Sequence, residues 1–195
     1  MGIFHFLVTL TRFSLKFLLF LVIVKLCYVS SILLVIVLRF LADGMLGKLT
    51  RWLRILGHDV TYFRSTDDKN LIKMANSESR VLLTRDQELV HQALKKGVKT
   101  FFVKGIDNIE TLVDLANTFG FNFKIEISIS HCPKCNMLIR LVSKESVLLE
   151  IPELTALHYE EFWKCNGCGQ VYWQGAHWKM IIKTLEEAKR ILNNK

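Results

Sequence analysis

Four of the five cysteines occur as two Cys-x-x-Cys pairs near the C-terminal end of the chain. Cys132 and Cys135 lie in the run HCPKC, and Cys165 and Cys168 lie in the run WKCNGCG. Each pair is typical of a tight turn that presents two thiolates to one ion, and four such sulfurs complete a tetrahedral zinc site. Because this site has no open coordination position, it predicts a structural zinc ion, and a redox pair is the weaker alternative. Thiols of this kind require a reducing compartment, so we expect the folded part to face the cytoplasm.

Acidic residues that follow four strand-like segments form the second pattern that could support chemistry. Asp43 follows the first segment, Asp67 and Asp68 the second, Asp86 the third and Asp107 the fourth. Carboxylates crowded at buried strand ends repel one another unless a divalent cation neutralises them, and hard oxygen ligands suit Mg²⁺ or Mn²⁺. A cation held by Asp43, Asp86 and a third acid would be suited to phosphodiester hydrolysis. For Asp107, and for one of the pair Asp67 and Asp68, a helix N-cap is the preferred interpretation.

The charge balance favours a polyanionic partner. The chain carries 26 Lys and Arg against 18 Asp and Glu, and outside the acid-free first 38 residues 23 basic and 18 acidic side chains leave a net charge of +5. Such an excess suits nucleic acid without requiring it. We expect the phosphate backbone to contact Lys48, Arg51, Arg54 and Arg85. For the first three, a solvated basic helix face is an equally good interpretation.

Strand-like and helix-like segments alternate through residues 35–128, which predicts a parallel sheet with crossover helices. The predicted strands cover residues 35–42, 60–63, 80–84 and 99–103. The predicted helices cover residues 46–56, 69–77, 87–96 and 109–119, and Gly57, Gly97 and Gly120 end three of them. Right-handed crossovers bring the carboxyl ends of all strands to one edge, so the acidic residues should meet there.

The cysteine pairs define a small module over residues 129–178, and an amphipathic helix over residues 179–195 follows it. The module is rich in aromatic side chains that could stack on RNA bases, but a small ribbon also needs a core, so we predict core positions for most of Tyr159, Phe162, Trp163, Tyr172, Trp173 and Trp178. His177 is predicted to be structural, and His131 receives no role because four thiolates already complete the zinc site.

Three runs together with the paired cysteines resemble one known family. The runs are FLADGMLGKLTRWLRILGHDV from residue 40, DDKNLIKMA from residue 67 and RVLLTRDQELV from residue 80. This combination is similar to the Mut-seven C-terminal RNase domain family, a PIN-like nuclease group with an appended zinc ribbon. The resemblance covers residue 39 to the C-terminus and implies a PIN-like fold with metal-dependent RNA cleavage. Asp43, Asp68 and Asp86 match the acidic positions, with Asp67 adjacent to the second of these.

Two functions are compatible with this pattern. The first is a ribonuclease that uses an acidic Mg²⁺ or Mn²⁺ site, with a structural zinc ribbon that helps to bind RNA. The second is a non-catalytic RNA-binding or RNA–protein assembly module with the same fold. An enzyme requires Asp43, Asp86 and a third acid to converge on a shared ion.

The N-terminal segment is the part that departs from the family pattern. Residues 17–38 are apolar apart from Lys25 and a few small polar side chains, and at about 1.5 Å per residue they could span a hydrocarbon core of about 30 Å. A charge near the centre of a bilayer costs about 2.5 to 3.5 kcal/mol, and the predicted strand at residues 35–42 limits the segment to residues 1–34. A membrane anchor, a mistranslated upstream extension and a soluble helix packed on the domain all stay open. As an anchor, the segment would hold the domain at the inner face of the membrane, because it is followed by Arg39, Lys48, Arg51 and Arg54.

Overall fold

Four strands and four helices alternate along the first half of the computed structural model, which describes residues 37–105 and 107–194. They are β1 (Arg39–Ala42), α2 (Gly47–Ile55), β2 (Asp59–Tyr62), α3 (Asp68–Ser77), β3 (Val81–Thr84), α4 (Gln87–Lys95), β4 (Thr100–Phe102) and α5 (Asn108–Phe119). This order confirms the predicted alternation, and the observed ends lie within one residue of the predicted ends for all elements except β1. That strand begins at Arg39 instead of residue 35, and residues 35 and 36 lie outside the described part.

The four strands form one parallel sheet in the order β2-β1-β3-β4. Phe40 of β1 pairs with Val60 of β2 on one side and with Val81 of β3 on the other. The order makes β2 and β4 the edge strands, and the parallel direction brings the carboxyl ends of all four strands to the same edge of the sheet. The predicted parallel sheet is thereby confirmed.

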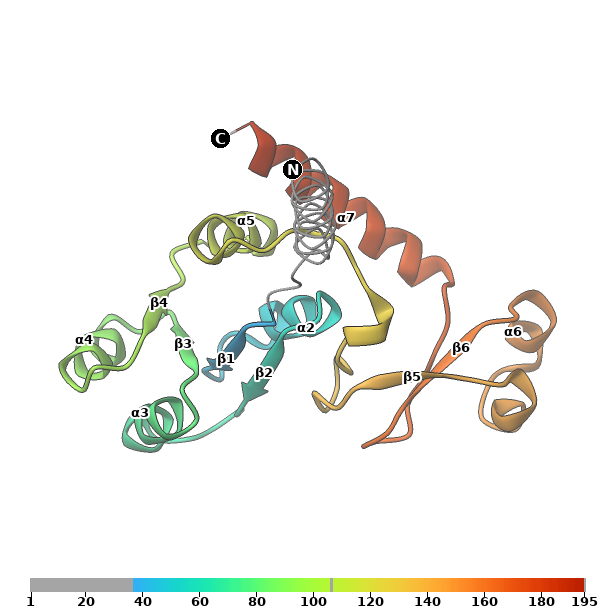
Figure 1. Ribbon diagram of the computed structural model, residues 1–195, viewed down its shortest axis with the longest axis horizontal. Helices are drawn as coiled ribbons and strands as arrows, with labels where there is room; N and C mark the ends of the chain where they lie inside the picture. The colour runs from blue at the N-terminus through green and yellow to red at the C-terminus, as the bar shows by residue number, and fades with distance from the viewer. Residues whose placement is uncertain (1–36, 106, 195) are drawn as a thin grey trace, which may run out of the picture. The chain divides into compact units, whose positions relative to one another are not determined.

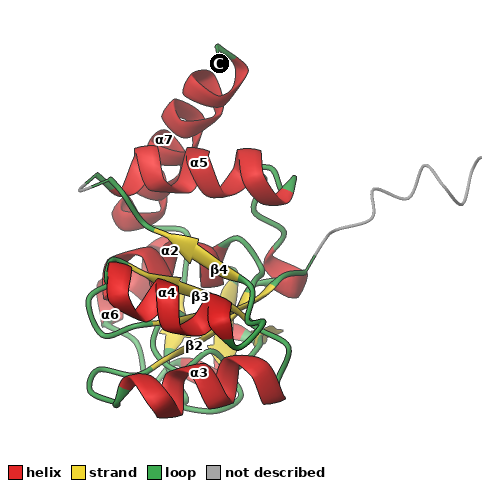
Figure 2. Ribbon diagram, turned by 90° about the vertical axis from the view of Figure 1, so that its left-hand side faces the viewer, coloured by secondary structure: helices red, strands yellow, loops and turns green. Residues whose placement is uncertain are grey.

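Helices cover both faces of this sheet because side chains alternate along each strand. Phe40 and Ala42 of β1 join the cluster that packs against α2, α5 and the C-terminal helix, whereas Leu41 joins the cluster that packs against α3 and α4. Neighbouring β3 divides in the same way, with Leu83 in the first cluster and Leu82 in the second. Figure 2 shows the resulting layers, with α5 above the sheet and α3 below it.

A second sheet of three antiparallel strands lies in the cysteine-rich part of the chain. It has the order β5-β6-β7. The elements of this part are η1 (Ile127–Ile129), β5 (Ile139–Val142), η2 (Lys144–Val147), α6 (Glu153–His158), β6 (Phe162–Cys165) and β7 (Val171–Tyr172). Its small core contains Val147, Ile151, Phe162 and Val171.

The C-terminal helix α7 (Ala176–Asn193) returns from this module to the first sheet. Its buried residues Leu185 and Ala188 belong to the cluster that includes α5, which confirms the predicted packing of this helix. It begins three residues earlier than predicted. Figure 1 shows α7 extending from the side of α5 towards the three-stranded module.

Ion pairs hold the amino-terminal edge of the parallel sheet, opposite the edge where the predicted acidic site lies. Arg80 is buried and donates to Oδ2 of Asp59 at 2.9 Å, to Oε2 of Glu78 at 2.6 Å and to the carbonyl of Phe40 at 3.2 Å. Arg39 adds a bond to Oδ2 of Asp59 at 3.4 Å. Burial would raise the pKa of Asp59, but these donors together with Asn136 outweigh burial and lower it. The starts of β1, β2 and β3 are therefore held together by charge-assisted bonds.

The predicted apolar segment at residues 1–34 lies outside the described residues. Within residues 37–105 and 107–194, none of the helices combines the length and the apolarity that a membrane span needs.

His58 is a buried histidine at the amino-terminal edge. Its ring packs edge-on against Phe40 and Phe121, with centroid distances of 5.7 and 4.6 Å. Nδ1 accepts a bond from the backbone N–H of Leu38 at 3.4 Å, so the neutral ring carries its proton on Nε2, which is buried without a partner among the described residues. Burial, with a smaller contribution from His131, lowers the pKa of His58 to about 4.

This lowered pKa predicts a loss of stability in mild acid. His58 binds its proton with a pKa of about 6.5 in the unfolded chain and about 4 in the folded chain. The contribution of neutral His58 to the free energy of unfolding is therefore present above pH 6.5 and is lost as the pH falls from there towards 4. We expect the free energy of unfolding to drop by roughly 2 kcal/mol between pH 7 and pH 5 relative to His58→Phe, which keeps the ring but cannot titrate. Urea unfolding of both proteins at the two pH values measures this. If the difference in the free energy of unfolding between the two proteins is the same at pH 7 and pH 5, the prediction is wrong.

Candidate functional site

Asp43 is the carboxylate most firmly placed at the carboxyl-terminal edge of the sheet. It directly follows central strand β1 and is only 7% exposed. Its Oδ1 accepts the backbone N–H of Met45 at 2.8 Å, and its Oδ2 accepts the hydroxyl of Thr84 and the backbone N–H of Arg85 at 3.3 Å. These three donors fix the carboxylate in place.

Asp86 lies beside Asp43 through Thr84. The Thr84 hydroxyl donates to Asp43 and accepts the backbone N–H of Asp86 at 3.0 Å. Asp86 is also the N-cap of α4, since its Oδ1 accepts the N–H groups of Glu88 and Leu89 at 2.8 and 3.2 Å. The sequence favoured a site role over a cap for Asp86, and the structure adds the cap. Oδ2 takes part in neither capping bond and is available to another ligand.

The other acidic residues divide as their sequence suggested. Asp67 is the N-cap of α3 and accepts two bonds from Asn70 at 2.8 Å, and Asp107 is the N-cap of α5. Asp68 occupies the first turn of α3 and is half-buried. The loop that leads to α3 lies against the loop after Asp43, because a Cβ on Gly44 would come within 2.5 Å of the Arg64 carbonyl. This contact requires glycine at position 44.

The carboxylates do not form a tight cluster. Across residues 37–105 and 107–194, the four cysteines are the group of three or more candidate ligands whose donor atoms all lie within 4.8 Å of one another. The structure therefore links Asp43 and Asp86 through Thr84 without bringing Asp68 into the same group.

Three of the four predicted phosphate contacts have an accessible side chain. Lys48 and Arg51 are exposed on α2, three residues apart. Arg85 is half-buried beside Asp43 and donates one bond, from its terminal nitrogen to the carbonyl of Gly105 at 2.8 Å. Its Nε–H is buried without a partner among the described residues, so this guanidinium retains a donor that an anion could use.

Arg54 corrects the prediction, because it is not on the solvent face of α2. It is 6% exposed, and its guanidinium donates to the carbonyl of Val60 at 2.7 and 3.0 Å. It also donates to the carbonyls of Pro133 and Lys134 at 3.0 and 3.3 Å. These acceptors occupy the guanidinium, so Arg54 is a structural residue and not an RNA contact.

The four predicted cysteine ligands converge. Sγ of Cys132 lies 3.6 Å from that of Cys168, and Sγ of Cys135 lies 3.3 Å from that of Cys165. Sulfurs bound at about 2.3 Å around one tetrahedral ion are separated by about 3.8 Å, so the donor set fits zinc. Gly167 permits this approach, since a Cβ there would lie 3.3 Å from the Cys135 sulfur and 2.5 Å from Met137.

Hydrogen bonds around Cys165 favour its thiolate form, whereas burial raises the pKa of Cys132 and of Cys135. Burial would raise the pKa of Cys165, but the backbone N–H groups of Cys168 and Gly167 point at its sulfur and lower it. The hydroxyl of Tyr172 lies 3.0 Å from Sγ of Cys132, and burial together with this thiolate raises the pKa of Tyr172. Tyr172 is therefore a neutral donor to the metal ligand, an outer-shell contact that orients it.

The first cysteine turn docks on the edge strand β2. Val60 of β2 directs its backbone groups away from β1, and the N–H donates to Oδ1 of Asn136 at 3.0 Å while the carbonyl accepts Arg54. Nδ2 of Asn136 donates to Oδ1 of Asp59 at 2.6 Å. The outward backbone groups of Val60 are thereby satisfied by the cysteine turn and by α2.

A cavity of about 530 Å³ lies between the zinc module, the end of α2 and the start of α7. Its aromatic lining residues are Trp163, Tyr172, Trp173 and Trp178. The sequence predicted core positions for most aromatics of the module. Phe162, Tyr159 and Trp173 do belong to the small core, but Trp163, Tyr172 and Trp178 do not. His177 also lines this cavity and is exposed.

Sequence reasoning missed two residues of these sites, Thr84 and Asn136. The signal for Thr84 was a hydroxyl at the last position of a buried strand, two residues before Asp86. Asn136 directly follows the first cysteine pair and has a left-handed backbone with φ of 71°. Asparagine tolerates that conformation well, and its position after the turn could have marked it.

Comparison with known protein families matches residues 38–185 to the family described as Mut7-C RNAse domain. The matched range contains the three runs that resembled this family, both cysteine pairs, Asp43 and Asp86. Comparison with curated proteins and with solved structures gives no match.

We expect Cys132→Ser to abolish zinc binding and to loosen the three-stranded module. Zinc contributes about 10 to 16 kcal/mol of apparent free energy in zinc-finger peptides, comparable with the stability of a whole domain. Elemental analysis of the purified chains measures the bound metal. Cys27→Ser is the matched control, because Cys27 lies outside the two pairs and should keep one zinc per chain. A wild-type chain that carries no zinc would overturn the assignment.

We expect Arg54→Ala to lower the free energy of unfolding by about 2 to 4 kcal/mol, since it leaves the carbonyl of Val60 and two carbonyls of the cysteine turn without their charged donor. Arg51→Ala is the matched control on the exposed face of the same helix and should change stability by less than about 0.5 kcal/mol. Urea unfolding of both variants distinguishes these roles. Equal effects would mean that the Arg54 contacts contribute little.

Proposed function

Because this chain belongs to the Mut7-C RNAse domain family, we propose that it is a ribonuclease that hydrolyses RNA phosphodiester bonds at a Mg²⁺- or Mn²⁺-dependent site built on Asp43. The observation that carries the proposal is the position of this carboxylate. Asp43 is buried at the carboxyl end of a central parallel strand, and Thr84, the last residue of neighbouring β3, joins it to the backbone of Asp86 at the start of α4. Open α/β sheets bind their ligands at this edge.

The donor set at this edge suits a hard divalent cation, because it consists of oxygens. Asp43 and Asp86 would hold the ion, and Asp68 in the first turn of α3 would be the third acid. When bound, such an ion would supply a Lewis acid and lower the pKa of a water molecule. The Thr84 hydroxyl ties the Asp43 carboxylate to the backbone of Asp86, and the backbone N–H of Met45 holds the other oxygen of Asp43.

The cationic residues around this edge would bind the RNA backbone. Arg85 follows β3 beside Asp43, and the charge of its half-buried guanidinium would favour an anion such as a phosphate at this point. Lys48 and Arg51 extend the positive charge along the exposed side of α2. RNA would thus be held by phosphate contacts, and the zinc ion would serve the fold of the module beside it.

One observation favours the second function, a non-catalytic RNA-binding module with the same fold. Asp86 caps α4, and the carboxylates of the described residues are not gathered as tightly as the cysteine sulfurs. As a non-catalytic module, the chain would bind RNA through its basic surface without cleaving it.

Asp86→Asn tests the catalytic proposal with little effect on the fold. Asparagine keeps the capping oxygen that accepts the N–H groups of Glu88 and Leu89, but it removes the charge that would hold the cation. We expect metal-dependent cleavage to fall at least about 100-fold. RNA binding in a titration without divalent ions should stay unchanged, because it depends on Lys and Arg. Asp43→Asn should also stop cleavage, with some loss of stability, because an amide oxygen that accepts from Thr84 and Arg85 leaves the NH₂ group facing the backbone N–H of Met45.

Asp67→Asn is the matched control, since Asp67 caps α3 as Asp86 caps α4 but already directs both oxygens to Asn70. It should cleave at the wild-type rate. If Asp86→Asn and Asp43→Asn also cleave like the wild type after removal of contaminating nucleases, the acidic site is wrong and the non-catalytic function replaces it.

A further inference from the structure

The aromatic cavity beside the zinc module has the composition of a ligand site. Its volume of about 530 Å³ lies within the usual range for small-ligand pockets, and indole and phenol rings form much of its wall. Neither a carboxylate nor a lysine or arginine side chain lines it among the described residues. Its walls therefore suit a flat aromatic group that belongs to an anionic molecule, because nothing in the lining repels negative charge.

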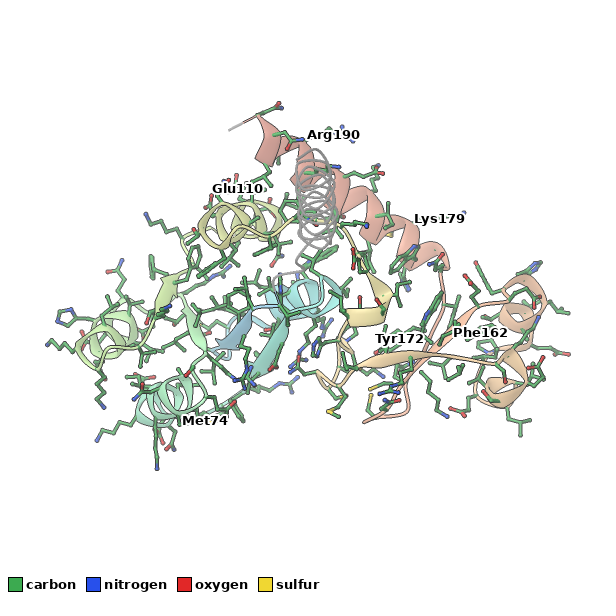
Figure 3. The ribbon with its side chains drawn as sticks, in the orientation of Figure 1. Met74, Glu110, Phe162, Tyr172, Lys179 and Arg190 are labelled. Carbon is green, nitrogen blue, oxygen red and sulfur yellow. The ribbon has the colours of Figure 1, made fainter. Side chains whose placement is uncertain are left out.

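Two of the rings that line this cavity, those of Tyr172 and Trp173, are held in place by the surrounding structure. The hydroxyl of Tyr172 is tied to the zinc ligand Cys132 at 3.0 Å. The indole of Trp173 packs on Gly175, where a Cβ would lie 2.8 Å from Nε1. Figure 3 shows Tyr172 on the side of the module near α2, away from Phe162 of the small core. Walls that are fixed before the ligand arrives lose little conformational entropy on binding.

Polar groups in the cavity are available for hydrogen bonds to a base. Nδ1 of His131 lies 2.6 Å from the carbonyl of Asn136, which orients the ring and leaves Nε2 as an acceptor in the neutral form. The indole N–H groups of Trp163 and Trp178 and the imidazole of His177 have no hydrogen-bond partner among the described residues. The cavity thus offers both donors and acceptors, as the edges of nucleobases do.

A basic stripe on α2 leads from the acidic edge to this cavity. Lys48, Arg51 and Ile55 are spaced three and four residues apart, so they lie on one side of the helix. Lys48 follows the Asp43 loop at the start of α2, Arg51 is exposed one turn later, and Ile55 lines the cavity. The helix rises about 13 Å over its nine residues, which is a distance that a few nucleotides of an extended strand would cover. Lys134 adds positive charge beside the cavity, because its ammonium group donates to Gln170, which lines it.

From these observations we infer that the cavity binds an unpaired nucleobase of single-stranded RNA whose backbone runs along α2 from the acidic edge. This inference rests on the proposed function for the choice of RNA and deepens it, since it assigns unpaired strands as the substrate class. Trp163 and Trp178 stack on the base, and His131 and His177 contact its edge. A base in a duplex cannot enter, because both of its faces are already stacked.

The test measures binding to the full chain carrying Asp43→Asn, which removes cleavage, without added divalent ions and in a mild detergent because of the apolar N-terminal segment. The probes are a single-stranded RNA of about ten nucleotides, the same sequence as a duplex, and an abasic strand of equal length. We expect the single strand to bind most tightly, and Trp178→Ala to weaken its binding about 5-fold to 100-fold. Trp178→Phe should keep most of the affinity, because it retains a stacking ring. Trp52→Ala is the matched control, an indole of α2 that does not line the cavity.

Zinc content is measured for each variant, so that loss of binding is compared only between chains with an intact module. Equal affinity of Trp178→Ala and its parent for the single strand would overturn the inference, as would equal binding of the abasic strand or of the duplex. These outcomes are separate from the fate of the nuclease proposal. If RNA binding depends on Trp178 but the wild-type chain does not cleave RNA, the base site is supported and the acidic site is contradicted. If the wild-type chain cleaves RNA but binding does not depend on Trp178, the acidic site is supported and the base site is contradicted.

Discussion

The buried guanidinium of Arg54 is the contact on which the rest of the structure depends. A charge taken out of water must be met by fixed acceptors, and Arg54 has them on two sides. One is the carbonyl of Val60 in edge strand β2, and the others are the carbonyls of Pro133 and Lys134 between the first two cysteines. The cysteine turn presents these two carbonyls in one direction, and a metal ion held by the four sulfurs would close the turn. Burial lowers the pKa of Arg54, and the thiolates of Cys132 and Cys135 oppose this shift. The four-cysteine site, the Arg54 guanidinium and edge strand β2 are therefore packed together as one unit.

The two edges of the parallel sheet differ in how their charged side chains are paired. At the amino-terminal edge, Asp59 and Arg80 pair with each other and the zinc module docks through Asn136, so the charges there are matched. At the carboxyl-terminal edge, Asp43 has neutral donors and no cation paired to it among the described residues, so its charge is available to a ligand. Helix α2 connects the two edges. Among the described residues, a carboxylate without a paired cation at one edge is thus combined with matched charges at the other.

The sequence predicted the parts of this structure that depend on local pattern. Apolar periodicity and glycine stops located the alternating strands and helices, and cysteine spacing located the zinc ligands. The sequence-based prediction was wrong where the position of a side chain depends on a partner far away in the sequence. Arg54 looks like an exposed basic residue of an amphipathic helix, although it follows Leu46 and Thr50 at intervals of four and so lies on their buried side. Its acceptors at residues 133 and 134 are far away in the sequence. The aromatics of the module likewise could not be divided between core and cavity, because that division depends on where α7 begins and how it returns.

The docking of the cysteine turn on β2 has a consequence for the apo chain. An edge strand with free backbone N–H and carbonyl groups is a template on which another chain can add a strand. Here Asn136 and Arg54 occupy those groups at Val60, and the strand is only four residues long. Loss of the metal would release the turn that positions Asn136 and would uncover this edge beside apolar residues of the sheet. Zinc limitation would then reduce the solubility of the protein through strand-to-strand aggregation, in addition to any effect on its site.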